Sequence, residues 1–133
     1  MVTDPIADML MRIKNAGDAG NPTTQIPYSE IKMRIANILL EEGYVTAVTK
    51  KAGKSAAQKF IEVGISYDAD RRPRFGGLVR VSRPSRRVYS GVAELKPVHQ
   101  GHGIMILSTP KGLMTDKTAR KEHVGGEVIC KIW

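Results

Sequence analysis

The spacing of apolar residues changes near residue 44, and this change limits the folds that the chain can adopt. Before residue 44, apolar side chains recur at intervals of three or four, which is typical of amphipathic helices. The apolar residues are Ile6, Met9, Leu10 and Ile13 in one segment and Ile31, Ile35, Ile38 and Leu39 in the next. Asp4 and Ser29 stand where helix N-caps are expected, and Gly17 and Gly43 follow the last apolar residues. We therefore expect two helices between these limits.

After residue 44, apolar and polar residues alternate, most regularly over residues 60–67, and this period predicts strands. The strands expected in this part cover residues 44–49, 60–67, 78–81, 88–92, 104–107 and 128–132, and one more short strand, residues 25–27, is expected between the two helices. Pro27 confines the first strand to a sheet edge, because proline donates no ladder hydrogen bond. Thr115 is a suitable N-cap for a short helix over residues 116–122.

A charged, turn-rich stretch, residues 68–77, divides these patterns into two parts. We expect an α+β protein. Residues 1–67 form an N-terminal subdomain of two helices and a small sheet, and residues 68–77 form the connecting segment. The N-terminal subdomain is expected to pack on a mostly β C-terminal subdomain with one short helix, residues 78–133.

Two short segments near the C-terminal end carry the clearest chemical signal. They are Ser108-Thr109-Pro110-Lys111-Gly112 and Gly125-Gly126-Glu127. Glycine allows a close backbone approach, hydroxyls donate to phosphate, ribose or base edges, and lysine suits phosphate. No nucleophile–base pair accompanies them, so the pattern indicates nucleic-acid recognition rather than catalysis.

The charge of the chain is unevenly distributed. The formal net charge is +8, of which residues 1–66 contribute +1 and residues 67–133 contribute +7. The basic excess therefore coincides with the Ser/Thr/Gly segments, and it favours a polyanionic partner. Aromatic residues make up only 5% of the chain, so base stacking cannot be the main mode of binding.

Other sequence features narrow the class of protein. Cys130 is the only cysteine, so no internal disulfide can form, and we expect it to fill a core position in a reducing cytoplasm. Neither a signal peptide nor a membrane-spanning run is expected. The soft metal ligands are His99, His102, His123 and Cys130, and we expect no metal and no cofactor.

Several strings, in a consistent order, resemble the small-subunit ribosomal protein eight family. They are DPIADML at residues 4–10 with RIKN at 12–15, RVSRP at 80–84 with RVY at 87–89, GHGI at 101–104, STPKG at 108–112 and GGE at 125–127. The resemblance covers nearly the whole chain. Pro110 departs from it, because serine is usual there, and the change removes a hydroxyl and an N–H donor.

The resemblance implies a structural, non-enzymatic protein of the cytoplasmic ribosome. It implies direct binding to the central domain of 16S ribosomal RNA, assembly of the platform, and contacts with neighbouring small-subunit proteins as a monomer within the particle. Binding to its own operon messenger RNA is a further expectation. Carried over residue by residue, the implied RNA contacts are Ser108, Thr109, Lys111, Gly112, Gly125, Gly126 and Glu127.

Further cationic and aromatic residues are candidate RNA contacts: Arg86, Arg87, Tyr89, Arg12, Lys14, Lys32 and Lys54. Arg86 and Arg87 are expected on opposite faces of a strand, so one pairs structurally while the other meets RNA. For Tyr89, core packing is favoured over stacking on a base. Glu127 either accepts a hydrogen bond from RNA or orients the neighbouring loop.

Two other classes of function remain open on the residues alone. An enzyme is disfavoured, because no phosphate-binding loop, nucleophile elbow or metalloprotease helix is present in the sequence. A protein-interaction module that is basic only for solubility would bind ribosomal RNA weakly and without regard to its sequence.

Overall fold

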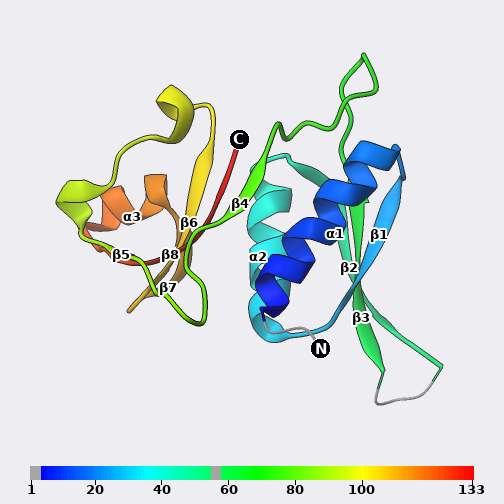
Figure 1. Ribbon diagram of the computed structural model, residues 1–133, viewed down its shortest axis with the longest axis horizontal. Coiled ribbons are helices and arrows are strands. Elements are labelled where there is room, and N and C mark those ends of the chain that lie inside the picture. Colours follow the sequence, from blue (N-terminus) through cyan, green and yellow to red (C-terminus); the bar gives the residue numbers. More distant parts are fainter. Residues whose placement is uncertain (1–3, 55–57) are drawn as a thin grey trace. The chain divides into compact units, whose positions relative to one another are not determined.

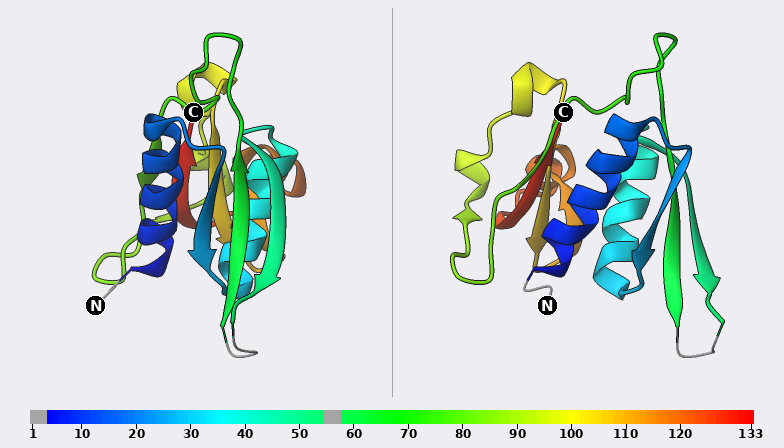
Figure 2. Two further views of the ribbon diagram at one scale, coloured as in Figure 1. Left: turned by 90° about the vertical axis from the view of Figure 1, so that its right-hand side faces the viewer. Right: turned by 45° about the vertical axis from the view of Figure 1, so that its right-hand side comes forward.

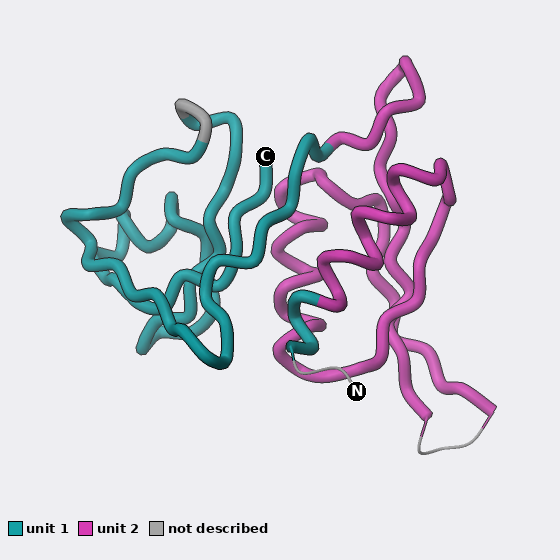
Figure 3. Tube along the Cα trace, in the orientation of Figure 1, with its two compact units in different colours: residues 1–7, 75–133 teal, residues 8–74 magenta. Residues whose placement is uncertain are grey.

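The computed structural model describes residues 4–54 and 58–133 (Figure 1). The described residues form two compact units, one within residues 8–74 and the other from residues 4–7 with 75–133 (Figure 3). The helices are α1 (Pro5–Ala19), α2 (Glu30–Glu41) and α3 (Asp116–Glu122), with short 3-10 turns η1 (Val92–Glu94) and η2 (Val98–Gly101). The strands are β1 (Thr23–Pro27), β2 (Val45–Ala52), β3 (Lys59–Ile65), β4 (Leu78–Arg80), β5 (Tyr89–Ser90), β6 (Ile104–Thr109), β7 (Gly112–Thr115) and β8 (Gly126–Ile132). The expected α+β class is confirmed.

Helix α1 starts as its sequence predicts but ends later. The carboxylate of Asp4 accepts a hydrogen bond from the Ala7 N–H at 3.2 Å, as expected of an N-cap. The predicted end at Gly17 is wrong, because the helix continues to Ala19 and Gly20 then adopts a φ of +73°. Glycine costs a helix about 1 kcal/mol, and burial of neighbouring Ala16 and Ile13 outweighs this cost.

Helix α2 is capped by Ser29, whose side chain accepts from the Lys32 N–H at 3.2 Å. The buried residues of the helix are Lys32, Ile35, Ala36 and Leu39. Ile31 is 40% exposed, so its expected place in the buried stripe is wrong. Ile35 and Leu39 are buried as expected, Ile38 is only partly buried, and Lys32 is buried in place of Ile31, where its methylene chain contributes apolar surface.

The sheet of unit 8–74 has the order β1-β3-β2, entirely antiparallel. Strand β1, which ends at Pro27, lies at an edge, as the proline predicts. Ile61, Val63 and Ile65 of β3 are buried, and helices α1 and α2 lie along one face of the sheet (Figure 2). The Tyr67 hydroxyl donates to the carbonyls of Ala16 and Asn21, which holds the end of α1 beside the sheet.

The second unit contains a five-stranded antiparallel sheet with β8 near its centre. The strand order is β4-β8-β6-β7, and β5 also pairs with β8. Helix α3 packs on this sheet through a core of Leu95, Val98, Met105, Leu107, Ala119 and Val128. The expected strand over residues 88–92 is wrong in extent, because only Tyr89–Ser90 pairs and η1 follows. Strand β7 was not expected, since its four residues lack a regular alternation.

Cys130 occupies the middle of β8 and is fully buried, as expected of a core position. Burial raises the pKa of its thiol from 9.0 to about 12, and the nearby charge of Arg80 opposes this shift. The thiolate is the reactive form of cysteine, so both the inaccessibility and the raised pKa suppress its chemistry.

We expect Cys130 in the folded protein to react with a disulfide reagent at pH 8 at least about 100-fold more slowly than in guanidinium, because it is buried and protonated. A fast stoichiometric reaction of the folded protein would contradict its buried position.

A second measurement follows from the direction of the same pKa shift. Between about pH 9 and 12 the unfolded thiol loses its proton while the folded thiol keeps it, so stability falls as pH rises. The free energy of unfolding should fall more steeply above pH 9 for the native sequence than for Cys130→Ala, by up to about 1.4 kcal/mol per pH unit. Parallel pH profiles would contradict the raised pKa.

Candidate nucleic-acid interface

The turn between β6 and β7 presents Pro110 and Lys111 at its tip. Thr109 and Gly112 are paired at its base, and Gly112 has a φ of +111°, which favours glycine. The Thr109 hydroxyl accepts from the Lys111 N–H at 3.1 Å and donates to the Gly112 carbonyl at 2.8 Å. Pro110 fits at the tip, because the chain turns there and proline is common in turns. The Thr109 side chain therefore fixes the shape of the turn and is itself buried.

The ammonium of Lys111 lies on the outside of this turn. Its Nζ is 3.3 Å from Glu122 Oε2, and both side chains are about half exposed. An exposed ion pair of this kind contributes little stability, typically about 0–1 kcal/mol. Lys111 can therefore exchange Glu122 for a phosphate at small cost.

Four residues from four adjacent strands form a row across the second sheet. Tyr89 of β5 pairs with Glu127 of β8, Glu127 pairs with Ser108 of β6, and Ser108 pairs with Leu113 of β7. Directly paired residues place their side chains on the same face of a sheet. We call these four residues the transverse row. It brings together three of the expected RNA contacts beside the Lys111 turn.

Glu127, which lies between Tyr89 and Ser108 in the transverse row, forms an ion pair with Arg87. Arg87 Nη1 is 3.0 Å from Glu127 Oε2, and the Glu127 side chain is 14% exposed. The hydrogen bond to Glu127, followed by its charge, raises the pKa of Arg87. This contact is with Arg87 and not with the Lys111 turn, so both roles expected for Glu127, accepting from RNA and orienting the neighbouring loop, stay predictions. The ion pair holds the Arg87 guanidinium beside Glu127 and partly neutralises the carboxylate.

Tyr89 is 69% exposed, so the expectation that it packs in the core is wrong. Its strand β5 is at the border of the sheet and covers only two residues, so no second layer encloses the ring. The exposed ring lies on the same face as Glu127 and Ser108 and offers a flat surface for a ribose or a base.

Gly125 and Gly126 allow the backbones of three strands to approach closely. A Cβ at Gly125 would overlap the carbonyl oxygen of Ser90, and a Cβ at Gly126 would overlap that of Ser108. Both clashes involve backbone atoms, which a change of rotamer cannot relieve. The glycine pair is thus a requirement of the sheet that positions the transverse row.

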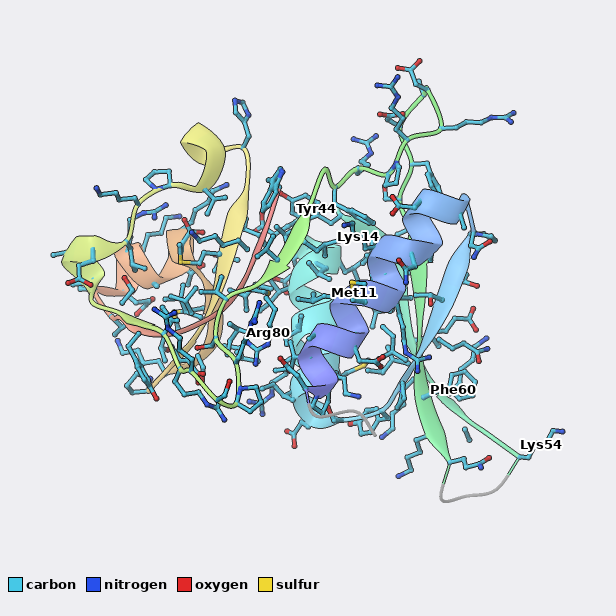
Figure 4. The ribbon with its side chains drawn as sticks, viewed as in Figure 1. Met11, Lys14, Tyr44, Lys54, Phe60 and Arg80 are labelled. Atoms are coloured by element: carbon cyan, nitrogen blue, oxygen red, sulfur yellow. The ribbon has the colours of Figure 1, made fainter. Side chains whose placement is uncertain are left out.

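The candidate contacts of unit 8–74 are more scattered. Arg12 and Lys54 line one hollow of about 540 Å³, together with Lys59, Tyr28 and Phe60. Lys54 extends from the tip of the β2–β3 hairpin, whereas Lys14 lies on α1 (Figure 4). Arg12 is paired with Asp8 at 2.8 Å.

Lys32 lies in a different environment from the other cations of this unit. Only 6% of the residue is exposed, and burial lowers the pKa of its ammonium, an effect that the charge of Asp8 opposes. A buried position disfavours the phosphate contact that the sequence suggested, because the ammonium lacks the exposure of Lys14 and Lys54.

Arg83 is absent from the residues expected to bind RNA, although it pairs with Arg86 across a tight hairpin. The signal was present in the sequence, since Pro84-Ser85 is a plausible two-residue turn and the flanking arginines then face each other.

Catalytic and metal chemistry find little support in the described part of the chain. No group of three or more His, Cys, Asp or Glu side chains is placed to hold a metal within residues 4–54 and 58–133, and the His99 side chain lies outside the described residues. In the same ranges, no helix combines the length and apolar character needed to cross a membrane. The candidate residues on the surface instead supply hydroxyl groups, cationic side chains and glycine-containing turns.

Such a small, basic α+β scaffold has the features of a structural protein that binds a polyanion. The family model described as Ribosomal protein S8 matches residues 4–133. The chain belongs to the ribosomal protein S8 family, and it is accordingly a structural constituent of the ribosome rather than an enzyme.

Full-length relatives agree with this assignment. A protein of Solibacter usitatus named small ribosomal subunit protein uS8 is 45% identical over 133 residues, covering all of both chains. Its namesake in Persephonella marina is 49% identical over 136 residues, again covering both chains completely. That of Caldicellulosiruptor bescii is 49% identical, covering 99% of this chain and 98% of its own.

We expect Gly126→Ala to lower the free energy of unfolding by about 2–3 kcal/mol, because the new methyl group overlaps the Ser108 carbonyl. Gly91→Ala is the matched control, since nothing lies within 4 Å of its Cβ position and its φ is −77°. The control should stay within about 0.5 kcal/mol of the native sequence in urea denaturation. Equal stability of the two variants would contradict the close approach of β6 and β8.

Proposed function

We propose that this chain is a primary binding protein for 16S ribosomal RNA in the small ribosomal subunit. It binds the central domain of that RNA directly and helps to assemble the platform. In this proposal it acts on the cytoplasmic ribosome as a monomer within the particle, beside neighbouring small-subunit proteins. The same surface would serve for binding its own operon messenger RNA. The family membership and the names of its relatives support the ribosomal part of the proposal.

The transverse row beside the Lys111 turn is the observation that carries the RNA part of the proposal. Ser108, Glu127 and Tyr89 occupy adjacent positions of three paired strands on one face. An A-form stem hides its base edges in a deep major groove, so proteins contact its shallow minor groove, its 2′-hydroxyls and its irregular positions. A row in which a hydroxyl, a carboxylate and a phenol lie on one face of a sheet suits such a surface.

Charge around the row is arranged so that RNA can approach. Arg87 neutralises the carboxylate of Glu127 and is itself 51% exposed. Lys111 stands at the other side, on a turn whose shape the Thr109 hydroxyl fixes. Phosphates beside a minor groove would therefore meet one cation next to Glu127 and another on the turn that follows Ser108.

The experiment that tests this function is filter binding to a fragment of the 16S central domain, with an unrelated stem of equal length as the competitor. We expect preference for the central-domain fragment at moderate salt. Equal binding to both RNAs would favour a protein-interaction module that is basic only for solubility.

Lys111→Ala should make the dependence of log K on log[salt] shallower by about 0.7–0.9, because one phosphate contact is lost. Arg34→Ala is a matched control, since Arg34 also forms an exposed ion pair with a glutamate and carries the same charge. The control should leave the slope unchanged. An equal change in both variants would mean that only total charge matters.

Ser108→Ala and Thr109→Ala should each weaken binding to the central-domain fragment by about 1–2 kcal/mol. For Ser108 the loss is a hydrogen bond to RNA, and for Thr109 it is the bond that shapes the turn. Thr49→Ala, an exposed strand position of unit 8–74, serves as the control. Unchanged affinity in both hydroxyl variants would remove the turn from the interface.

A further inference from the structure

Strand β8 contains a β-bulge. Two neighbouring residues of β6 lie opposite Cys130 and Val128, so the residue between these, Ile129, has no partner in β6. An extra residue of this kind changes the face on which the next side chains lie, because side chains alternate along a strand. Glu127 and Cys130 lie on the same face, although they are three positions apart, because their partners in β6 are two positions apart.

The bulge decides which side chain of β8 joins the transverse row. In a regular ladder that kept the pairing of Cys130, Val128 would lie opposite Ser108, and Glu127 would turn to the other face. Tyr89 pairs with Glu127 and would turn with it. Val128 would also leave the apolar core that α3 covers. The composition of the row therefore depends on one irregular residue of β8.

Arg80, the last residue of β4, contacts the bulge (Figure 4). Its Nη1 donates to the Ile129 carbonyl at 2.7 Å, and the Val81 N–H donates to the same oxygen at 3.0 Å. The N–H of Ser82 donates to the next carbonyl, that of Val128, at 3.1 Å. Hydrogen bonds from a charged donor are roughly twice as strong as neutral ones, so the guanidinium is the strongest of these donors.

Asp4 neutralises Arg80 and fixes its position. Arg80 Nε is 3.1 Å from one carboxylate oxygen of Asp4 and 3.4 Å from the other. The side chains are only 9% and 17% exposed, so either charge would be costly without the other. The same carboxylate accepts from the Ala7 N–H at the start of α1. Residues 4–7 belong to the same compact unit as β4 and β8.

We propose that Asp4 and Arg80 are positioning residues for the binding of RNA. Neither touches the RNA in this proposal. Asp4 orients Arg80, Arg80 holds the bulge at Ile129, and the bulge keeps Glu127 in the transverse row. The proposal rests on the proposed function, because it concerns the same row, and it adds the contacts that set the register of the row.

The first experiment tests whether the two residues hold the bulge, in full-length variants. Asp4→Asn removes the charge but keeps an oxygen that caps α1, because asparagine is as good an N-cap as aspartate. Arg80→Gln removes the guanidinium. In both variants, hydrogen exchange of the Val81 and Ser82 amides should become at least about 10-fold faster relative to the Met105 amide, because the bulge opens locally.

Arg120→Gln is the matched control for this measurement. It removes another arginine of the same unit that pairs with a buried carboxylate, that of Asp116, at 2.9 Å. Asp116 also accepts from the Met105 N–H at 3.1 Å. The control should therefore speed up exchange at Met105 and leave the amides of Val81 and Ser82 at their native rates.

The second experiment measures binding to the central-domain fragment at a temperature at which every variant is folded. Asp4→Asn and Arg80→Gln should each bind about 10-fold more weakly, because the row loses its register, and the control should stay within about twofold of the native chain. The slope of log K against log[salt] should stay native, because no phosphate contact is lost. In the Arg80→Gln background, Asp4→Asn should change the affinity by less than about twofold, because both residues act through one series of contacts.

Asp4→Asn is the most informative variant. Loss of a negative charge favours binding to a polyanion, so a purely electrostatic effect would strengthen binding, whereas the loss of register weakens it. Should Arg80→Gln fail to fold, Asp4→Asn decides both measurements, since it keeps the cap of α1.

The outcomes separate the two proposals. Native exchange rates at Val81 and Ser82 in Asp4→Asn overturn the positioning role, as does faster exchange with native affinity for RNA. A salt slope shallower by about 0.7–0.9 in Arg80→Gln overturns it in favour of a direct phosphate contact, and tighter binding by Asp4→Asn overturns it in favour of charge alone. Each of these results leaves the proposed function intact. Equal binding of the native chain to both RNAs defeats the proposed function, and faster exchange in the variants then preserves the hold on the bulge while overturning its role in RNA binding.

Discussion

The close approach of backbones around strand β8 is the constraint on which the second unit depends. This strand pairs with β6 on one side and with β4 and β5 on the other. Its start fits only because Gly125 and Gly126 leave room for the carbonyls of Ser90 and Ser108. A side chain at either position would separate the strands, and the row of polar residues across them would lose its register.

The polar surface of the second unit follows from this sheet. Register places Tyr89, Glu127 and Ser108 next to one another, although they are far apart in sequence. The hydroxyl of Thr109 then shapes the adjoining turn, where Lys111 is exposed. The adjacent hydroxyls of Ser108 and Thr109 therefore have different surroundings. The Thr109 hydroxyl closes the turn, and Ser108 lies in the transverse row.

Ion pairing divides the cations of the chain into groups with different tasks. Arg80 is bound to Asp4 and is nearly buried, so it holds structure in place, whereas Arg87 is bound to Glu127 and stays about half exposed. Arg83 and Arg86 have no such partner in the described residues, and Lys111 has only an exposed one. The net charge of the chain follows from its composition and does not distinguish these groups of cations. The distinction depends on which carboxylates folding brings close to each cation.

Elements whose signals are local can be predicted from the sequence. The caps at Asp4 and Ser29, the short helix after Thr115 and the edge position of β1 depend on residues a few places apart, so they were predicted correctly. The exposure of Tyr89 and the burial of Lys32 in place of Ile31 could not be predicted in this way. The same is true of the strands that pair with β8. All three features depend on which distant segments pack together, and the spacing of apolar residues within one segment carries no information about that packing.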